Sequence, residues 1–178
     1  MATGHRWRDL SLSASTPRWV ASALAPSIHR PFLARSGAVL QVRYRATVAY
    51  DGTDFLGFQS QEHASREVRT VQSVLEGVIR GLVGHSVRVV GAGRTDAGVH
   101  ASGQVVHFDL PSALSMGVFE FERAVNALLP DDVRVFGVAV APDHFHARFS
   151  ATARSYRYLI ENSRFSTPHL RRCAWHVT

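Results

Sequence analysis

The sequence predicts an α+β domain whose strands and helices follow the order β-α-β-β-α-β and then a further strand. Several segments alternate apolar and polar residues with a period of two, and two segments carry apolar residues at helical spacing. Of the 178 residues, 46% are hydrophobic and 19% are charged, which supports a sizeable core. This length favours one domain with a short appendage.

Residues 1–40 have the composition of a disordered, transit-peptide-like leader. The segment is rich in Ser, Ala, Arg and Pro, and Asp9 is its only acidic residue. A disordered tail or a mispredicted start codon is the alternative. We therefore expect localisation in an organelle, a mitochondrion or chloroplast, and otherwise in the cytoplasm. The folded domain is expected over residues 43–178.

The first part of this domain is predicted to hold a strand, a helix and a second strand. Over Val42–Tyr50 the residues alternate, and their β-branched and aromatic side chains predict a half-buried strand that Asp51-Gly52 ends. Thr70 is a candidate N-cap for a helix with one apolar face, and Gly84 can end this helix. A short strand is expected over Val87–Val90.

The second part repeats the pattern. A strand is expected over Gln104–Asp109, a helix over Val118–Leu128 that Pro130 stops, and a strand over Val133–Val140. A fifth strand is expected where Tyr156–Ile160 alternates. The order is ferredoxin-like, with an antiparallel or mixed sheet and helices on one face. Such a fold hosts many activities and does not by itself predict one.

Residue usage excludes several classes of protein. All 20 basic side chains are arginine, so a Schiff-base lysine and a P-loop lysine are impossible. Cys173 is the single cysteine, which excludes a disulfide framework and a cysteine-based zinc site. No stretch approaches about 18 uncharged apolar residues, so we expect no membrane span. Residues 144–178 hold six arginines against one acid, which suits a polyanionic partner, although a merely solvated face is the alternative.

The segment Gly91–Gly103 has the composition of a functional loop. Eight of its thirteen residues are Gly, Ala or Ser, and glycine lets the backbone approach a ligand closely. The dinucleotide-binding fingerprint fails because Asp96 occupies its third glycine position. A carboxylate beside Arg94 stays ionised, which suits a nucleophile or base. A structural salt bridge within the loop is the alternative.

This loop and four other segments share their order and spacing with a known family. The segments are Gly93–Ala101 (GRTDAGVHA), Gly103–Phe108, Tyr50–Gln59, Arg69–Glu76 and Asp143–Tyr158. Together they resemble the TruA family of tRNA pseudouridine synthases, and the resemblance extends from about Tyr44 to the last residue.

The resemblance implies the isomerisation of uridine to pseudouridine in tRNA. Asp96 matches the catalytic aspartate, which attacks or deprotonates the uridine. Arg94 matches the arginine that pairs with this aspartate or fills the gap left by a flipped base, and Tyr156 matches the tyrosine that packs on the target base. The resemblance also implies no metal and no organic cofactor, tRNA as the partner, and a homodimer for the complete family protein.

Four histidines lie in or near these segments, namely His100, His107, His144 and His146. They do not predict a metal site, because the sequence has no cysteine cluster to accompany them. We expect His100 and His146 to serve loop packing and hydrogen bonding. Phe145 and Phe149 are expected in the core beneath the site.

Family members continue for roughly as long again beyond this sequence. We therefore expect the N-terminal half of a catalytic domain, incomplete at its C-terminus, with an exposed sheet edge and an apolar face. Little synthase activity is expected from the chain alone. Two alternatives remain open. One is a catalytically inactive, truncated RNA-binding fragment of the family, and the other is a ferredoxin-like interaction module whose loop is structural.

Overall fold

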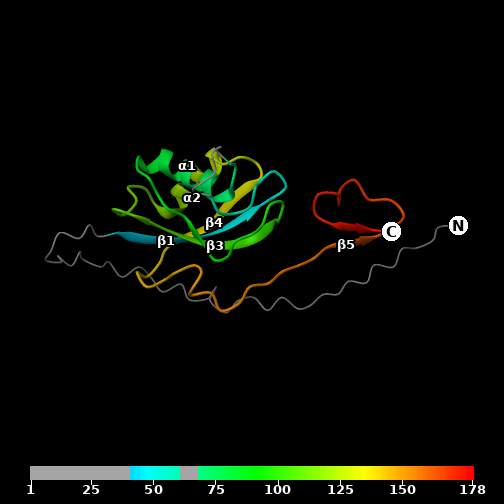
Figure 1. Cartoon of the computed structure of the whole chain (residues 1–178). Helices are drawn as coiled ribbons and strands as arrows, with labels where there is room; N and C mark the ends of the chain where they lie inside the picture. The colour runs from blue at the N-terminus through cyan, green and yellow to red at the C-terminus, as the bar shows by residue number, and fades with distance from the viewer. Residues whose placement is uncertain (1–40, 61–67) are drawn as a thin grey trace. The chain divides into compact units, whose positions relative to one another are not determined.

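The computed structural model describes residues 41–60 and 68–178, and the expected leader over residues 1–40 lies outside the described residues. Figure 1 shows the order of the elements along the chain. They are β1 (Val42–Tyr50), α1 (Val71–Val83), β2 (Val90–Gly91), β3 (Ala101–Leu110), α2 (Val118–Leu128), β4 (Val133–Val140), β5 (Ile160–Asn162) and β6 (Trp175–Val177).

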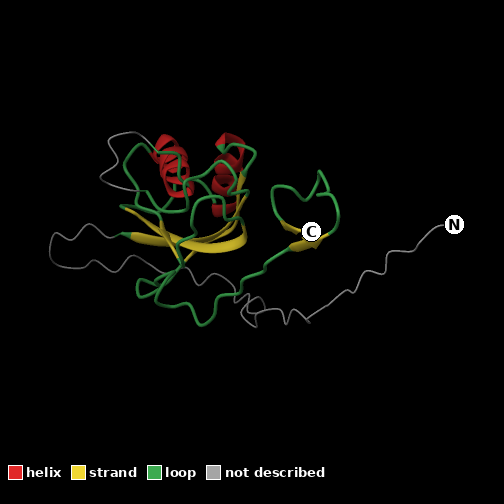
Figure 2. Cartoon of the chain, turned by 45° about the vertical axis from the view of Figure 1, so that its right-hand side comes forward, coloured by secondary structure: helices red, strands yellow, loops and turns green. Residues whose placement is uncertain are grey.

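The first four strands form one antiparallel sheet in the order β2-β3-β1-β4. Both helices cover the same face of this sheet, as Figure 2 shows. Helix α1 connects β1 to β2, which run parallel with β3 between them. Helix α2 connects β3 to β4, which run parallel with β1 between them. This arrangement confirms the predicted ferredoxin-like α+β fold, with a purely antiparallel main sheet.

The core lies between this sheet and the two helices. Alternate residues of β1 and the apolar faces of the helices meet there, and full burial of each large apolar side chain is worth about 1.5–3 kcal/mol. The buried residues from these three elements include Tyr44, Ala46, Val48, Tyr50, Leu75, Ile79, Phe121 and Val125.

Helix α1 begins and ends where the sequence predicts. The hydroxyl of Thr70 accepts a hydrogen bond from the backbone N–H of Ser73 at 3.1 Å, and the Ser73 hydroxyl accepts one from the N–H of Thr70 at 3.1 Å. This capping box satisfies two donors that the first turn leaves free. Gly84 closes the helix with φ at +77°, a conformation that favours glycine.

The expected strand over Val87–Val90 is wrong in its bounds, since β2 covers only Val90 and Gly91. The backbone N–H of Val89 donates to the Glu76 carboxylate at 2.9 Å, and its carbonyl accepts from the Gln72 amide at 3.0 Å. Side chains of α1 therefore satisfy the backbone groups that a neighbouring strand would otherwise pair. The strand expected over Gln104–Asp109 is longer than predicted and forms β3.

The expected fifth strand over Tyr156–Ile160 is also largely wrong. Only Ile160 belongs to β5, which pairs in parallel with β6. Alternation predicts a two-faced strand, but a strand also needs a hydrogen-bonding neighbour. Within the described part of the chain, residues 156–159 belong to no strand, and the side chains of Tyr156 and Tyr158 are exposed. The Leu159 carbonyl, next to β5, accepts a hydrogen bond from the N–H of Trp175 at 2.7 Å.

Large apolar side chains remain exposed towards the C-terminus. Phe149 was expected in the core, but 78% of it is exposed, whereas Phe145 is half-buried. The exposed members of this region are Phe149, Tyr156, Tyr158, Leu159, Ile160, Phe165 and Trp175. These side chains lie in the segment that follows the four-stranded sheet, so the exposed apolar face expected on the sheet itself stays a separate prediction.

No helix among the described residues is both long enough and apolar enough to cross a membrane. The longer helix, α1, has 13 residues, whereas a bilayer needs about 20.

The segment from Asp143 to Ala147 is tied to the sheet face that lies opposite the helices. On β1, Arg43 forms a two-pronged ion pair with Asp109 of β3, with both N–O distances at 2.7 Å. The same guanidinium donates to the carbonyls of Asp143 and Phe145 at 2.8 Å. This arginine therefore joins two strands to the start of the segment Asp143–Tyr158, which the sequence analysis relates to the family.

His107 of β3 lies beneath this segment and is 4% exposed. Its Nδ1 accepts a hydrogen bond from the N–H of Ala147 at 3.1 Å, so this nitrogen carries no proton. Burial lowers the pKa of His107, and the charges of Arg43 and His146 lower it further, against a smaller opposing effect of Asp109. The folded protein therefore favours the neutral ring.

Stability should fall as the pH is lowered from 7 to 5. The unfolded chain takes up a proton on His107 near pH 6.5, whereas the folded chain resists it, so protonation favours unfolding with a slope of at most about 1.4 kcal/mol per pH unit. Urea denaturation at pH 7, 6 and 5 measures this slope. His107→Gln, whose amide oxygen can still accept from Ala147, should flatten it.

The matched control for this prediction is His169→Gln, because His169 is exposed. This variant should keep the slope of the unchanged protein. Identical slopes for His107→Gln and the unchanged protein would show that another group carries the pH dependence.

Candidate functional site

Two loops that leave neighbouring strands pack against each other. The first loop (residues 51–58) follows β1, and the signature loop (residues 92–100) precedes β3, where Tyr50 and Ala101 are partners in the sheet. Backbone hydrogen bonds join the loops, from Phe58 N–H to the Thr95 carbonyl at 3.0 Å and from Gly98 N–H to the Phe55 carbonyl at 3.2 Å. Each loop therefore supports the backbone of the other.

Two glycines of the first loop allow this close approach. A side chain on Gly52 would overlap the backbone carbonyl of Val99. Gly57 has φ at +96°, and a Cβ there would lie 2.7 Å from the carbonyl oxygen of Thr95. Both positions therefore require glycine, one for space and the other for space and backbone conformation.

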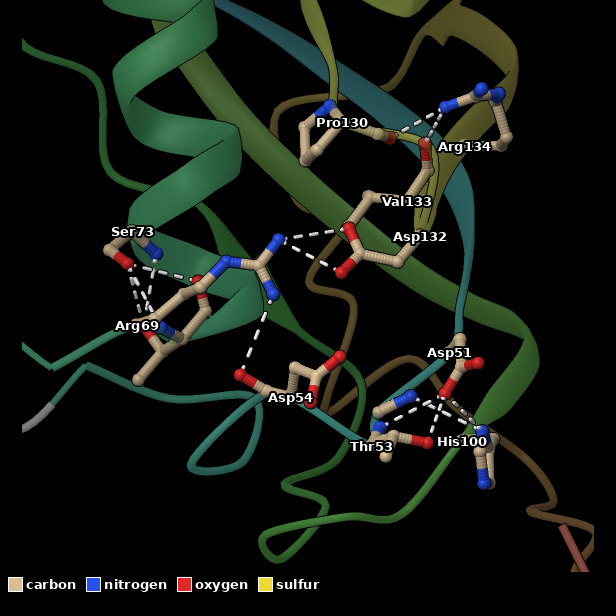
Figure 3. Close-up of polar contacts among 12 residues, drawn as sticks. Asp51, Thr53, Asp54, Arg69, Ser73, His100, Pro130, Asp132, Val133 and Arg134 are labelled. Carbon is tan, nitrogen blue, oxygen red and sulfur yellow. Dashed lines mark hydrogen bonds and ion pairs between the residues drawn. The ribbon is translucent and has the colours of Figure 1, made fainter. Parts of the chain in front are cut away.

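Arg69 and Asp132 hold the first loop from the other side, as Figure 3 shows. The Arg69 guanidinium contacts the Asp132 carboxylate at 2.9 Å and lies 3.9 Å from the centre of the Phe55 ring. The carbonyl of Asp132 accepts from the N–H of Asp51 at 2.9 Å. Arg69 belongs to the segment Arg69–Glu76, but that segment does not predict this role, since Asp132 lies 63 residues away.

His100 links the base of the signature loop to Asp51 and to a distant backbone group. Its Nδ1 lies 3.1 Å from the Asp51 carboxylate, as Figure 3 shows, and 3.2 Å from the N–H of Gly52. Its Nε2 lies 2.7 Å from the carbonyl of Arg172, so this nitrogen carries the proton and donates it. Hydrogen bonds from Thr53 lower the pKa of Asp51, and His100 adds to this effect.

The hydrogen-bonding role expected of His100 is therefore confirmed. The same holds for His146, whose Nδ1 accepts from the N–H groups of Arg148 and Phe149. The described residues contain no group of three or more His, Cys, Asp or Glu side chains that could hold a metal ion.

The predicted catalytic residues lie exposed on the signature loop. Within the described part of the chain, the side chains of Asp96 and Arg94 form no hydrogen bond or ion pair with each other or with any other residue. The structure therefore does not form the structural salt bridge that was the alternative for this loop. It presents a carboxylate with unused acceptor positions on a backbone held by other residues.

Arg154, in the segment Asp143–Tyr158, binds the backbone at the start of the signature loop. Its guanidinium donates to the Ala92 carbonyl at 2.8 Å and 3.2 Å and to the Arg148 carbonyl at 3.2 Å. Gln104 of β3 donates to the neighbouring Gly93 carbonyl at 2.8 Å. The one signal for Arg154 in the sequence is its membership of the segment Asp143–Tyr158, which does not by itself predict a partner.

Tyr156 lies two residues beyond this anchor and is 71% exposed. Among the residues that the structure describes, its ring has no aromatic or hydrogen-bonding partner. Arg154 thus connects the segment that carries Tyr156 to the loop that carries Asp96, although Tyr156 and Asp96 form no hydrogen bond with each other within the described residues.

The arrangement suits chemistry on a polyanionic substrate. An exposed carboxylate can act as a nucleophile or a base without first breaking an ion pair. Arg94 adds a positive charge to the same loop, and six further arginines lie in residues 144–178. Such charges attract phosphate groups.

The chain is similar to proteins of one family. A family model described as tRNA pseudouridine synthase matches residues 46–150. The tRNA pseudouridine synthase A of Nitratidesulfovibrio vulgaris is 50% identical over 135 residues, which cover 75% of this chain and 45% of that protein. The proteins of the same name from Latilactobacillus sakei and Geobacillus kaustophilus are each 48% identical over 75% of this chain, and 52% and 50% of their own lengths are covered. The chain spans about half the length of the curated relatives it matches.

Replacing Gly52 by alanine should separate the two loops. The new methyl group meets backbone, which cannot rotate away, so Gly52→Ala should cost about 1–3 kcal/mol of unfolding free energy. It should also speed amide hydrogen exchange in the signature loop. Chemical denaturation and hydrogen exchange followed by mass spectrometry measure both effects.

Gly81→Ala is the control, because a Cβ at this position in α1 meets nothing within 4 Å. This variant should be neutral or stabilising by about 0.4–1 kcal/mol and should leave exchange in the loop unchanged. Equal behaviour of the two variants would mean that the contact between the loops does not hold the signature loop.

Proposed function

The chain belongs to the tRNA pseudouridine synthase family, and on this premise we propose that it isomerises uridine to pseudouridine in tRNA through Asp96. One observation above all supports the proposal. Asp96 presents an exposed carboxylate that has no partner in the described part of the chain, on a loop whose backbone is held from both sides. That combination suits a group that must be both accessible and accurately placed.

The proposed reaction exchanges one bond to the ribose for another. The bond between N1 of uracil and C1′ breaks, and a bond between C5 and C1′ forms. C5 loses a proton and N1 gains one, so no atom is added or removed and the reaction needs no oxidant. Asp96 either attacks the nucleotide or removes a proton from it, and both roles require an ionised carboxylate.

Two further residues complete the proposed site. The guanidinium of Arg94 either pairs with Asp96 once the substrate is bound or occupies the gap that the flipped base leaves. Tyr156 offers an exposed ring on which the base can stack, an interaction worth about 1–3 kcal/mol. The exposure of both side chains supports roles that begin only when RNA is bound.

The proposed partner is tRNA, and for the complete family protein we also propose a homodimer. The arginines of residues 144–178 support contacts with phosphate, and the exposed apolar side chains of this segment support contact with a further polypeptide surface. Because the chain spans about half of its relatives, the same observations also favour a second candidate, an RNA-binding fragment without turnover. Product formation distinguishes the two.

Asp96→Asn should abolish turnover and leave tRNA binding intact. The substitution is tested in two proteins. One is the 178-residue chain itself, and the other is a chimera in which residues 42–178 replace the matching part of the Nitratidesulfovibrio vulgaris relative. We expect the substitution to lower the rate at least about 1000-fold, because an amide can neither attack nor accept a proton. Nucleoside mass spectrometry measures pseudouridine, and filter binding measures the Kd for tRNA.

Asp131→Asn is the control, since it removes another exposed carboxylate, which lies outside both loops and pairs with Arg134. It should leave the rate within twofold. A folded chimera that binds tRNA but forms no pseudouridine would favour the RNA-binding fragment, and near-normal turnover by Asp96→Asn would exclude Asp96 as the catalytic residue.

Tyr156→Leu should reduce the rate much more than Tyr156→Phe. Phenylalanine keeps the π face on which a base stacks, whereas leucine loses it and should lower kcat/KM about 10–100-fold. Tyr158→Leu, at a tyrosine of the same segment that is 88% exposed, controls for the loss of an exposed ring. Equal and severe losses in both Tyr156 variants would instead assign the role to the hydroxyl group.

A further inference from the structure

The hydroxyl group of Tyr50 reaches the residue that precedes Asp96. Tyr50 is the last residue of β1 and is 5% exposed, and its ring lies 6.2 Å from that of Phe58 in the first loop. Its hydroxyl oxygen lies 2.8 Å from Oγ1 of Thr95. A side chain of the rigid central strand therefore touches the signature loop next to its proposed catalytic residue.

Packing alone does not explain this hydroxyl group. A phenylalanine would fill the same space in the core, whereas a buried hydroxyl must recover the hydration that it loses. Burial raises the pKa of Tyr50, so the phenol keeps its proton and remains able to form the hydrogen bond with Thr95. The hydroxyl thus serves the contact with the loop.

Two hydrogen bonds hold Thr95, one at its backbone carbonyl and one at its side chain. Its carbonyl accepts from the N–H of Phe58 at 3.0 Å, and its side chain bonds to Tyr50. The side chain of Asp96 has no such support within the described residues, so its position follows from the backbone on either side of it. On the following side, the Asp96 carbonyl accepts from the N–H of Val99 at 3.2 Å.

We propose that Tyr50 is a positioning residue for the reaction, which places the Asp96 carboxylate by fixing the side chain of Thr95. The proposal rests on the proposed function of Asp96. A displacement of about 1 Å in a reacting group can cost about 100-fold in rate. Loss of one hydrogen bond at Thr95 should therefore lower kcat without removing any contact that binds tRNA.

The chain contains a matched control on the same strand. Tyr44 lies on the same face of β1, is 2% exposed, and accepts a hydrogen bond on its hydroxyl oxygen from the N–H of Leu114 at 3.0 Å. Tyr50 lies six positions further along the strand than Tyr44, which places the two residues about 20 Å apart. Tyr44→Phe therefore removes a comparable hydroxyl group at the end of the strand away from the signature loop.

The kinetic test uses whichever of the 178-residue chain and the chimera forms pseudouridine. Tyr50→Phe should lower kcat about 10–100-fold and leave KM and the Kd for tRNA within threefold, whereas Tyr44→Phe should leave kcat within twofold. Thr95→Val should reproduce the loss, and the double variant should lose no more than either single variant, because both remove the same hydrogen bond. Multiplied losses in the double variant, or equal losses at Tyr44 and Tyr50, would overturn the proposal.

A second measurement does not depend on turnover. In the 178-residue chain, Tyr50→Phe should speed amide exchange across residues 95–99 at least about tenfold, and Tyr44→Phe should not. Unchanged exchange together with unchanged kcat would refute the role of Tyr50. If Asp96→Asn retains activity, the proposed function fails, and the exchange result alone then decides whether Tyr50 holds the loop.

Discussion

The position of β1 between β3 and β4 governs where the candidate site forms. Because β1 is paired along both edges, its last residue, Tyr50, lies opposite Ala101, the first residue of β3. The loop that leaves β1 and the loop that enters β3 must then emerge side by side. Their contact through Gly52, Gly57 and Thr95 follows from this register. A site assembled on two such loops inherits the rigidity of the central strand.

Around these loops, arginine and histidine side chains bond mainly to backbone carbonyls. Arg154 holds the carbonyl of Ala92, His100 holds that of Arg172, and Arg69 combines an ion pair with a ring contact. Such anchors support the loop backbone without using the Asp96 carboxylate. The carboxylate therefore remains exposed, while its backbone neighbours are constrained. This division between supporting and reacting groups is what preorganised catalysis requires.

Sequence periodicity predicted the bounds of β1, α2 and β4 correctly and located α1 from its cap residues. These elements bury one face against a common core, so burial imposes the period of the element on the sequence. The same reasoning failed at Val87–Val90 and Tyr156–Ile160. There the apolar pattern is present, but side chains of α1 bond to the backbone of Val89 in the first case. In the second case, residues 156–159 join no strand among the described residues.

Residue types alone were sufficient to single out Asp96 and to relate the chain to its family, since a carboxylate within a glycine-rich loop is visible in a short stretch of sequence. Folding decided which groups hold that loop and which remain free. The partners of Arg154 and Arg69 lie 62 and 63 residues away along the chain, and within the described residues Arg94 and Asp96 form no ion pair with each other. A local pattern records which face of an element is buried. It does not record which distant donor meets a given acceptor, because the three-dimensional register of strands and loops sets that pairing.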